Sequence, residues 1–324
     1  MINETSNNND FVSYDKGVAM VKEQLDKTLL SVPPVVRSQA EHLAGSKGKF
    51  IRASALLACS QNDDGLIHPD AVKMAVSVEL LHLATLVHDD VIDNADMRRG
   101  MPTLQKKFGK HPAVISGDYL FCLALKVASG ATRKQEYLEF ELPDYMGRVC
   151  LGELMQGINN KNYELSIYRY LYIISGKTAA LFEASFYAGA MLCGTSKKEA
   201  GLYSRLGHYV GMIFQLVDDC IDYESSQKDA KKPVLSDYEQ GVITLPLIYT
   251  LKKNPKIKKL AKAGELTKSQ AVAAVNQAQG VEYTRMISKR YYDKAKIIID
   301  NLGLHSNKKV RLTALLDKAY TGLG

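Results

Sequence analysis

The stretch from Glu79 to Gly100 has the sequence ELLHLATLVHDDVIDNADMRRG. Its first half is a nearly continuous apolar run without proline or glycine, which predicts a buried helix. Asp89 and Asp93 are four residues apart, so a helix places them on one face with Asp90 beside them. Carboxylates on an apolar helix are unfavourable unless a cation lies between them, and oxygen ligands of this kind suit Mg²⁺. The stretch therefore predicts a magnesium site.

A second stretch repeats this pattern. The sequence FQLVDDCIDY occupies residues 214–223 and again follows an apolar helical run. A single cluster could be a solvated acidic helix end, but acids exposed for solubility have no reason to repeat the same spacing on a second apolar helix. We therefore expect both clusters to form two walls of one polyanion site. The predicted metal ligands are Asp89, Asp90, Asp93, Asp218, Asp219 and Asp222.

A basic segment, GKFIR at residues 48–52, precedes the first cluster. Lys49 and Arg52 are three residues apart and would share a helical face, just after Gly45 and Gly48, which can open a helix start. A helix amino terminus with Lys and Arg beside it suits a diphosphate, because amide donors, dipole and cations all favour an anion. The alternative is a solvated basic turn.

The segments HDDVIDNADMRRG, FQLVDDCID and GKFIR resemble the motifs of the trans-isoprenyl diphosphate synthases, the polyprenyl synthetase family. The resemblance covers about residues 45–249. It implies an isoprenoid synthase fold, in which a bundle of long helices surrounds a central active-site cavity. It also implies Mg²⁺-dependent condensation of isopentenyl diphosphate with an allylic diphosphate. Lys47 and Ala53 depart from the family pattern, which usually has glycine and proline at these positions.

The resemblance assigns roles to individual residues. Isopentenyl diphosphate is expected on Gly48, Lys49, Arg52, His82 and Arg99. The allylic diphosphate is expected on Arg98, Lys177, Thr178 and Lys232, and Gln215, which matches the family's FQ pair, completes the substrate-binding set. The expected catalytic residues are Asp89, Asp90, Asp93, Lys177, Asp218 and Asp219.

Three of these assignments also depend on local sequence. His82 lies two helical turns before the acids and points along their face, although a lone histidine on an apolar helix is more often a core residue. Arg98 and Arg99 follow the acids where the helix should end, at Gly100. SGKT at residues 175–178 resembles the end of a P-loop, but Leu171 stands where that motif requires glycine. We expect a helical Lys–Thr pair there instead.

Product length is predicted from the residues that precede the first acids. Thr85 is one turn before Asp89, Ala84 stands next to it, and Leu81 is a further turn away, so these residues would line a tunnel below the metals. Short-chain members of the family resemble one another in having an aromatic residue here. The small residues of this chain predict a deep pocket and a medium- or long-chain product, as for quinone side chains.

The remaining sequence favours an all-α, single-domain protein over residues 1–324. Apolar spacing predicts helices at residues 11–30 and 50–60 and another that opens at Pro69, whereas no segment alternates as a strand does. Residues 1–10 are expected to be disordered. The charge of +7 comes without a long basic tract or interleaved aromatic residues, so a diphosphate substrate explains it better than nucleic acid does.

Cellular context and partners complete the expectations. Five scattered cysteines without CxxC spacing indicate reduced thiols and no zinc site. The polar amino terminus and the lack of an uninterrupted apolar stretch of membrane-spanning length predict a cytoplasmic protein, with at most peripheral membrane contact. By resemblance we expect a homodimer, or a catalytic subunit that requires a small partner. A geranylgeranyl synthase, a terpene cyclase and a head-to-head synthase are the alternatives, although the all-Asp second motif disfavours the cyclase and the DDxxD spacing disfavours the head-to-head enzyme.

Overall fold

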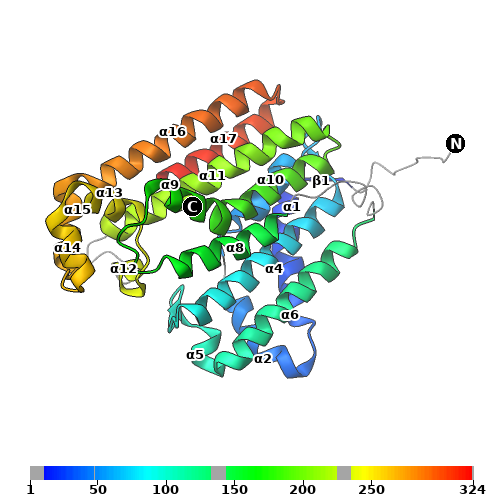
Figure 1. Cartoon of the computed structure of the whole chain (residues 1–324). Helices are drawn as coiled ribbons and strands as arrows, with labels where there is room; N and C mark the ends of the chain where they lie inside the picture. The colour runs from blue at the N-terminus through cyan, green and yellow to red at the C-terminus, as the bar shows by residue number, and fades with distance from the viewer. Residues whose placement is uncertain (1–10, 47, 133–143, 225–234, 323–324) are drawn as a thin grey trace. The chain divides into compact units, whose positions relative to one another are not determined.

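A computed structural model describes residues 11–46, 48–132, 144–224 and 235–322. These residues are predominantly helical, which confirms the all-α prediction (Figure 1). They form two compact units, each described separately below. The first comprises Met1–Pro143, Ser185–Tyr203 and Leu304–Leu312, and the second comprises Asp144–Ala184, Ser204–Gly303 and Thr313–Gly324. The single domain stays a prediction, and residues 1–10, expected to be disordered, lie outside the described residues.

The first unit contains the amino-terminal helices and four two-residue strands. Its elements are β1 (Val12–Ser13), α1 (Tyr14–Leu30), α2 (Pro34–Gly45), α3 (Ile51–Cys59), β2 (Leu66–Ile67), α4 (Pro69–Ile92), β3 (Met97–Arg98), β4 (Met101–Pro102), α5 (Leu104–Phe108) and α6 (Lys110–Ser129). The strands pair antiparallel, β1 with β2 and β3 with β4. The prediction that the chain has no strands is wrong at these two places, because a two-residue pair is too short to show alternation.

Helix α4 is the central element of this unit. It begins at Pro69 as predicted, since proline lacks the amide hydrogen that a first-turn residue would leave unpaired. The preceding residue, His68, caps the helix by accepting the Asp70 amide at 3.1 Å. Helix α6 lies along α4 (Figure 1), and the Ser77 hydroxyl donates to the Ala124 carbonyl across this contact at 2.9 Å. The buried apolar residues of α4 thus fix the helix that carries the first acids.

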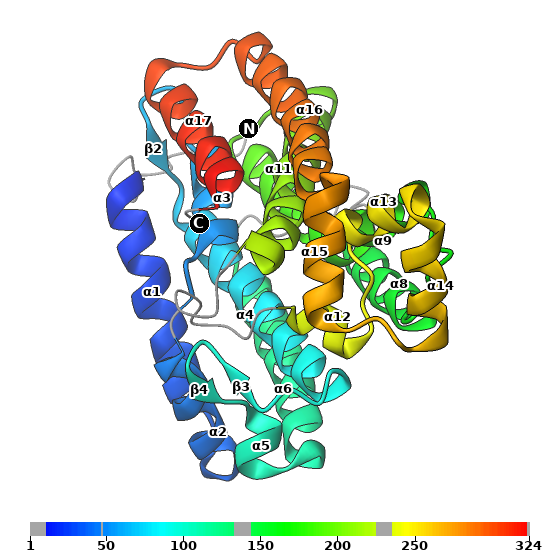
Figure 2. The same cartoon turned by 90° about the vertical axis from the view of Figure 1, so that its left-hand side faces the viewer.

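Two further expectations for this unit are corrected. Helix α4 ends at Ile92 with Asp93 as its cap, rather than at Gly100. Beyond it, β3 and β4 form a tight hairpin beside α5 (Figure 2). The two turn residues, Arg99 and Gly100, both have positive φ, as a two-residue hairpin turn requires. Helix α2 was not predicted, although Pro34 at its first turn is a helix-start signal.

The regular elements of the second unit are all helical within its described residues. Its elements are α8 (Tyr145–Ile158), α9 (Ile167–Ile174), the π-helical turn η2 (Ser175–Ala179), α12 (Ser236–Gln240), α13 (Leu245–Lys253), α14 (Pro255–Ala263), α15 (Lys268–Ala278) and α16 (Gly280–Asn301). The boundaries between the two units fall within α10 (Ala180–Leu192), α11 (Lys197–Glu224) and α17 (Ser306–Thr321).

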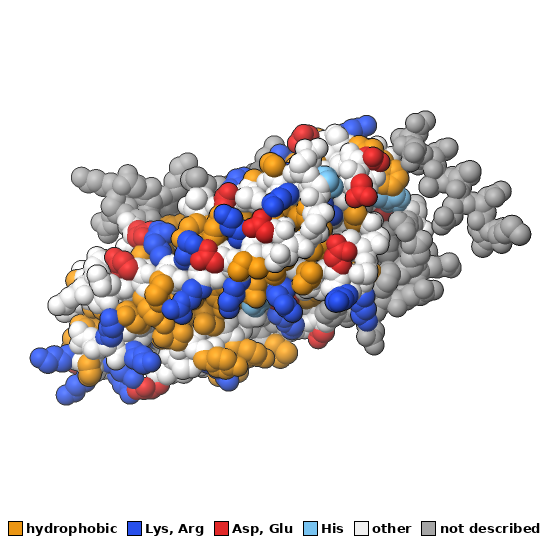
Figure 3. Space-filling view, turned by 90° about the horizontal axis from the view of Figure 1, so that it is seen from above, with side chains coloured by type: hydrophobic (Ala, Val, Ile, Leu, Met, Phe, Trp, Pro, Cys, Tyr) orange, Lys and Arg blue, Asp and Glu red, His pale blue; other side chains and the backbone are white. Residues whose placement is uncertain are grey.

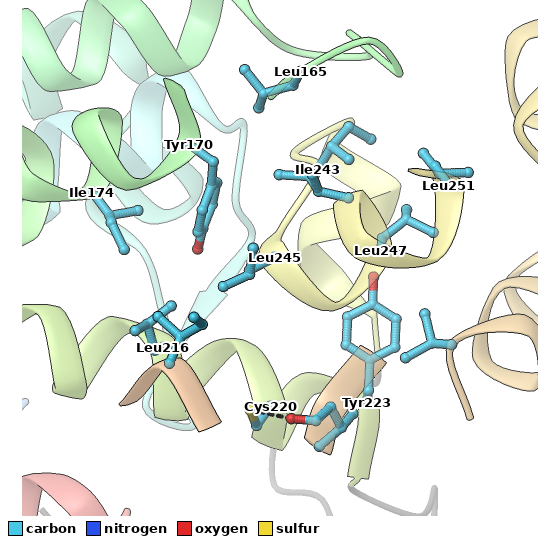
Figure 4. Packing of buried hydrophobic residues seen from close by; sticks show 14 of the residues in the cluster. Leu165, Tyr170, Ile174, Leu216, Cys220, Tyr223, Ile243, Leu245, Leu247 and Leu251 are labelled. Carbon is cyan, nitrogen blue, oxygen red and sulfur yellow. Dashed lines mark hydrogen bonds between the residues drawn. The ribbon is translucent and has the colours of Figure 1, made fainter. Parts of the chain in front are cut away.

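One hydrophobic cluster holds the second unit together. Tyr170 and Ile174 of α9 and Leu216 of α11 pack with Leu245 and Leu247 at the start of α13 (Figure 4). Burying an aliphatic side chain of this size is worth about 1.5–3 kcal/mol, so the cluster fixes α9 and α11 against each other. Those two elements carry the second set of expected site residues.

Two helices of the first unit have the length and apolarity of membrane-spanning segments. Helices α4 and α6 are long and apolar enough to cross a membrane, and the core helix of a soluble protein passes the same test. In α4, 56% of the most apolar window is buried inside the protein.

On the face shown in Figure 3, basic, acidic and hydrophobic side chains are interspersed. That face does not offer the continuous basic surface typical of a nucleic-acid-binding protein.

Candidate active site

The first aspartate cluster lies at the carboxyl end of α4. Asp89 and Asp93 are half-buried, and the Asp93 amide donates to the Asp89 carbonyl at 2.8 Å, which continues the helical turn between them. Asp90 is buried and accepts a hydrogen bond from Arg98 Nε at 2.6 Å. Burial raises the pKa of the Asp90 carboxyl, and the Arg98 charge opposes that rise. The cluster therefore has two half-buried acids, Asp89 and Asp93, one turn apart, and a buried middle acid, Asp90, bonded to Arg98.

The β3–β4 hairpin brings both expected arginines back to the end of α4. Arg98 bonds Asp90, and Arg99 Nη1 donates to the Ser46 carbonyl at 3.3 Å, just before the basic segment. A small pocket opens here, lined by Asp90 and both arginines together with Leu86 and Val87 of α4. Arg98 is thus bonded to the first acid cluster and Arg99 lines the same pocket; their diphosphate contacts stay a prediction.

The basic segment differs locally from its prediction. Phe50 adopts a left-handed conformation with φ 52° and caps α3, so Lys49 precedes the helix and does not share a helical face with Arg52. Gly45 ends α2 rather than opening α3. Gly48 lies against the Arg99 guanidinium, where an added Cβ would be 3.2 Å from Nη1. The segment is nevertheless brought close to Arg99, as its expected role requires.

A polar cluster of four residues joins α3 to α4. Arg52 Nη1 donates to His82 Nε2 at 3.1 Å, and buried Glu79 accepts the Ala53 amide at 2.9 Å. Burial, followed by the charges of nearby arginines, lowers the pKa of His82 well below its usual value, so the imidazole is neutral at neutral pH. Burial also lowers the pKa of Arg52 to about 10, against the opposing effect of Glu79. Cations confined in this way favour an incoming anion.

Glu79 was not predicted as a site residue. Burial raises the pKa of its carboxyl, whereas the Ala53 hydrogen bond and the charges of Arg52 and Arg99 oppose the rise. Its position one turn before His82, within an otherwise apolar run, is the signal that could have identified it. It places one acid beside the expected isopentenyl diphosphate residues.

The second aspartate cluster lies near the end of α11. Asp218 is exposed and Asp222 is half-buried, and the two are one turn apart, like Asp89 and Asp93. Asp219 is fully buried. It accepts a short hydrogen bond from the Tyr170 hydroxyl and another from Gln215 Nε2 at 3.0 Å. Burial raises the pKa of Asp219 well above its usual value, against the opposing effect of these two bonds.

The expected Lys–Thr pair lies in η2, a π-helical turn rather than an α-helix. The Thr178 hydroxyl donates to Gln215 Oε1 at 2.8 Å, so the FQ glutamine and the Lys–Thr pair lie together. Lys177 Nζ forms an ion pair with Glu153 Oε2 of α8 at 2.8 Å. Single π-helical turns within helices are frequent at functional sites, because the extra residue redirects side chains.

Close backbone packing fixes this turn against α8. A Cβ at Gly152 would lie 2.2 Å from the Lys177 amide nitrogen, and one at Gly176 would lie 2.7 Å from the Arg148 carbonyl oxygen. Glycine is thus required at both positions. Glu153, the partner of Lys177, follows Gly152 directly, and sequence reasoning assigned no role to either residue.

The remaining expectations fall into two groups. Lys232 lies outside the described residues. The chain-length residues lie on α4, where Ala84 is buried, Leu81 is half-buried, and the Thr85 hydroxyl donates to the His82 carbonyl at 2.8 Å. The tunnel that they would line stays a prediction, as does the union of both aspartate clusters in one site.

The carboxylates fit a hard divalent cation as donors, although the described residues hold no ready-made group of three metal-ligating side chains. Asp90 and Asp219 are buried and hydrogen-bonded to Arg98 and Tyr170. Oxygen donors that leave several coordination positions for water and phosphate are what Mg²⁺ prefers. The assignment of all six acids as metal ligands stays a prediction; Asp89, Asp93, Asp218 and Asp222 are the less buried of them.

An all-α protein with repeated carboxylate pairs and neighbouring cations belongs to the class that binds diphosphates through a metal. Comparison with known proteins identifies it further. Residues 33–281 match the family model described as polyprenyl synthetase. Heptaprenyl diphosphate synthase component 2 of Geobacillus stearothermophilus is 34% identical over 302 residues, which cover 91% of this chain and 92% of that protein. The chain belongs to the polyprenyl synthetase family.

Solved structures agree with this assignment. Heptaprenyl diphosphate synthase from Staphylococcus aureus has a TM-score of 0.87 and 30% identity, with 96% of this chain and 98% of that chain covered. A polyprenyl synthase from Caulobacter crescentus CB15, solved with calcium and isoprenyl diphosphate, has a TM-score of 0.82 and 26% identity, with 95% of each chain covered. The fold of the described residues is thus that of isoprenoid synthases.

Proposed function

We propose that this polyprenyl diphosphate synthase is a Mg²⁺-dependent enzyme that extends an allylic diphosphate, such as farnesyl diphosphate, with isopentenyl diphosphate. Repeated condensation gives a medium- or long-chain all-trans polyprenyl diphosphate. The observation that carries the proposal is the recurrence of a pair of acids one turn apart, Asp89 with Asp93 and Asp218 with Asp222, on two apolar helices. The names of the relatives support the product class.

The residues of the second unit, with Arg98 of the first, would bind the leaving group. Magnesium held by the two acid pairs named above would supply positive charge that stabilises the departing diphosphate. Lys177 would exchange its ion pair with Glu153 for a diphosphate oxygen, and Arg98 and Lys232 would add further positive charge. These contacts favour cleavage of the allylic carbon–oxygen bond, because charge develops on that oxygen as the bond breaks.

The basic cluster of the first unit would hold isopentenyl diphosphate. Lys49, Arg52 and Arg99 supply cations, and neutral His82 supplies a further hydrogen-bonding ring. The double bond of this substrate then attacks the allylic carbon, and loss of a proton restores the double bond. By the family resemblance the departing diphosphate accepts that proton. Orientation and exclusion of water are the chain's main contributions.

The environment and assembly of the enzyme are also proposed. We infer a cytoplasmic homodimer, with peripheral membrane contact for product release and no nucleic-acid partner. The five cysteines are scattered along the sequence without CxxC spacing, which is the basis for inferring a reducing compartment. The designation of one relative as a component supports a second possibility, in which this chain is the catalytic subunit of a two-protein enzyme.

The proposal is tested by incorporation of labelled isopentenyl diphosphate with farnesyl diphosphate and Mg²⁺. Asp89→Asn and Asp218→Asn should each lower kcat by a factor of 100 or more, about 3 kcal/mol of transition-state stabilisation. Asp96→Asn is the matched control, since this exposed carboxylate bonds only Lys106 among the contacts described for it. Removal of Mg²⁺ with EDTA should abolish incorporation. Equal activity of all three variants would refute the assignment of the carboxylate pairs.

A further inference from the structure

A chain of hydrogen bonds links three elements of the second unit. The Tyr170 hydroxyl of α9 bonds Asp219 of α11, Gln215 bonds the other oxygen of the same carboxylate, and Thr178 of η2 bonds Gln215. Figure 4 shows the Tyr170 ring among the apolar residues of the cluster, with its hydroxyl directed toward α11. None of the expected roles of the polyprenyl synthetase motifs includes Tyr170.

The centre of this hydrogen-bond network is buried. Tyr170, Thr178 and Asp219 are all buried, and Asp219 is 0% exposed. A carboxylate in such a place costs free energy unless its oxygens accept hydrogen bonds, and here each oxygen has one donor. Removal of either donor, Tyr170 or Gln215, therefore leaves one buried oxygen of Asp219 without its hydrogen bond and favours a change in the orientation of that side chain.

The orientation of Asp219 sets the orientation of its neighbours. Successive residues on an α-helix are about 100° apart, so holding Asp219 inward turns Asp218 to another face of α11, where it is exposed. Asp222 is four residues from Asp218 and follows it on that face. The inward bond thus fixes the face of α11 on which Asp218 and Asp222 lie.

The same hydrogen-bond network extends to η2, the turn that carries Lys177. Gln215 is three residues before Asp218 on α11, and its amide oxygen accepts the Thr178 hydroxyl. Thr178 adjoins Lys177, whose ammonium is the expected diphosphate contact. Tyr170 and Thr178 lie on one continuous helical segment, α9 followed by η2, and both residues are tied to α11 by these bonds.

We infer that Tyr170 is a positioning residue for prenyl transfer, which acts through Asp219 and Gln215 to orient the Asp218 carboxylate and the Lys177 turn toward the allylic diphosphate. The inference rests on the proposed function, because it concerns the same diphosphate. Tyr170 would not touch the substrate. Its hydroxyl would contribute by keeping the two groups that do so in register.

The test compares Tyr170→Phe, which removes one hydroxyl, with Tyr168→Phe on the same helix. Tyr168 is 80% exposed and serves as the matched control. Binding of inorganic pyrophosphate in Mg²⁺ is measured by calorimetry, and kcat and the KM for isopentenyl diphosphate are measured separately. For Tyr170→Phe we expect pyrophosphate affinity and kcat to fall about tenfold, the size of one hydrogen bond to a charged group, with KM for isopentenyl diphosphate unchanged.

A double variant distinguishes a positioning role of Tyr170 from a role in fold stability alone. If Tyr170 acts through Asp219, then adding Tyr170→Phe to Asp219→Ala should produce no further loss of pyrophosphate affinity. A Tyr170→Phe protein with a lower melting temperature but the affinity and kcat of Tyr168→Phe would overturn the inference. Failure of the wild-type chain to condense its substrates or bind pyrophosphate would instead refute the proposed function.

Discussion

Gly152→Ala tests how the Lys177 turn is held. The new Cβ would lie 2.2 Å from the Lys177 amide nitrogen and 2.8 Å from the Gly176 carbonyl carbon, whereas real Cβ contacts essentially never fall below 3.0 Å. The two backbones must therefore separate by about 1 Å, and no rotamer change can relieve the clash. Such overpacking costs about 1–3 kcal/mol or more, which exceeds the gain of about 0.5–1 kcal/mol that alanine brings to a helix.

The matched control is Gly157→Ala on the same helix, α8, where an added Cβ has no atom within 4 Å. There only the helix preference remains, so stability should rise by about 0.5–1 kcal/mol. Thermal melting reports stability, and pyrophosphate binding in Mg²⁺ reports the position of Lys177. We expect Gly152→Ala to melt several degrees lower and to bind pyrophosphate at least about tenfold more weakly, as for loss of one charged hydrogen bond. If both variants were equally stable and bound pyrophosphate equally, the packing argument would be refuted.

Three further predictions concern the first unit. Glu79→Ala leaves the buried Ala53 amide without its acceptor and should cost about 2–4 kcal/mol in denaturant unfolding and raise the KM for isopentenyl diphosphate; an unchanged midpoint would contradict this. The pKa of His82 is lower in the folded state than its value of about 6.5 in the unfolded chain. The contribution of His82 to the free energy of unfolding is therefore fully present above a pH of about 6.5, and it is lost as the pH falls through the folded pKa. Unfolding of His82→Gln should accordingly depend less on pH below about 6.5. Ala84→Phe should shorten the product, and unchanged product length would exclude the predicted tunnel.

The sequence was most informative where chemistry and helical spacing coincide. The two DDxxD segments, the helix that begins at Pro69 and the all-α class follow from apolar runs and i, i+4 spacing. These features are local, or repeat a pattern that local sequence displays. The hydrogen bond between Gln215 and Thr178, by contrast, was not predicted.

What the sequence did not reveal depends on contacts between distant residues. Nothing in the spacing of DDxxD indicates that Asp90 and Asp219 face Arg98 and Tyr170, because those partners come from other elements. The left-handed Phe50 separates Lys49 from its expected helix, and propensity gives no warning of that conformation in a non-glycine residue. The π-helical turn likewise depends on close packing against α8.

The measurement that tests the central claim most directly is the size of the product that the purified chain makes alone. Farnesyl diphosphate, labelled isopentenyl diphosphate and Mg²⁺ are incubated with the wild-type chain, and the extracted polyprenyl products are separated by length. The account predicts a ladder that extends well beyond the fifteen-carbon primer and ends at a medium or long chain. Absence of any elongation by the folded chain, also with geranyl and geranylgeranyl primers, would contradict its function as a self-sufficient synthase.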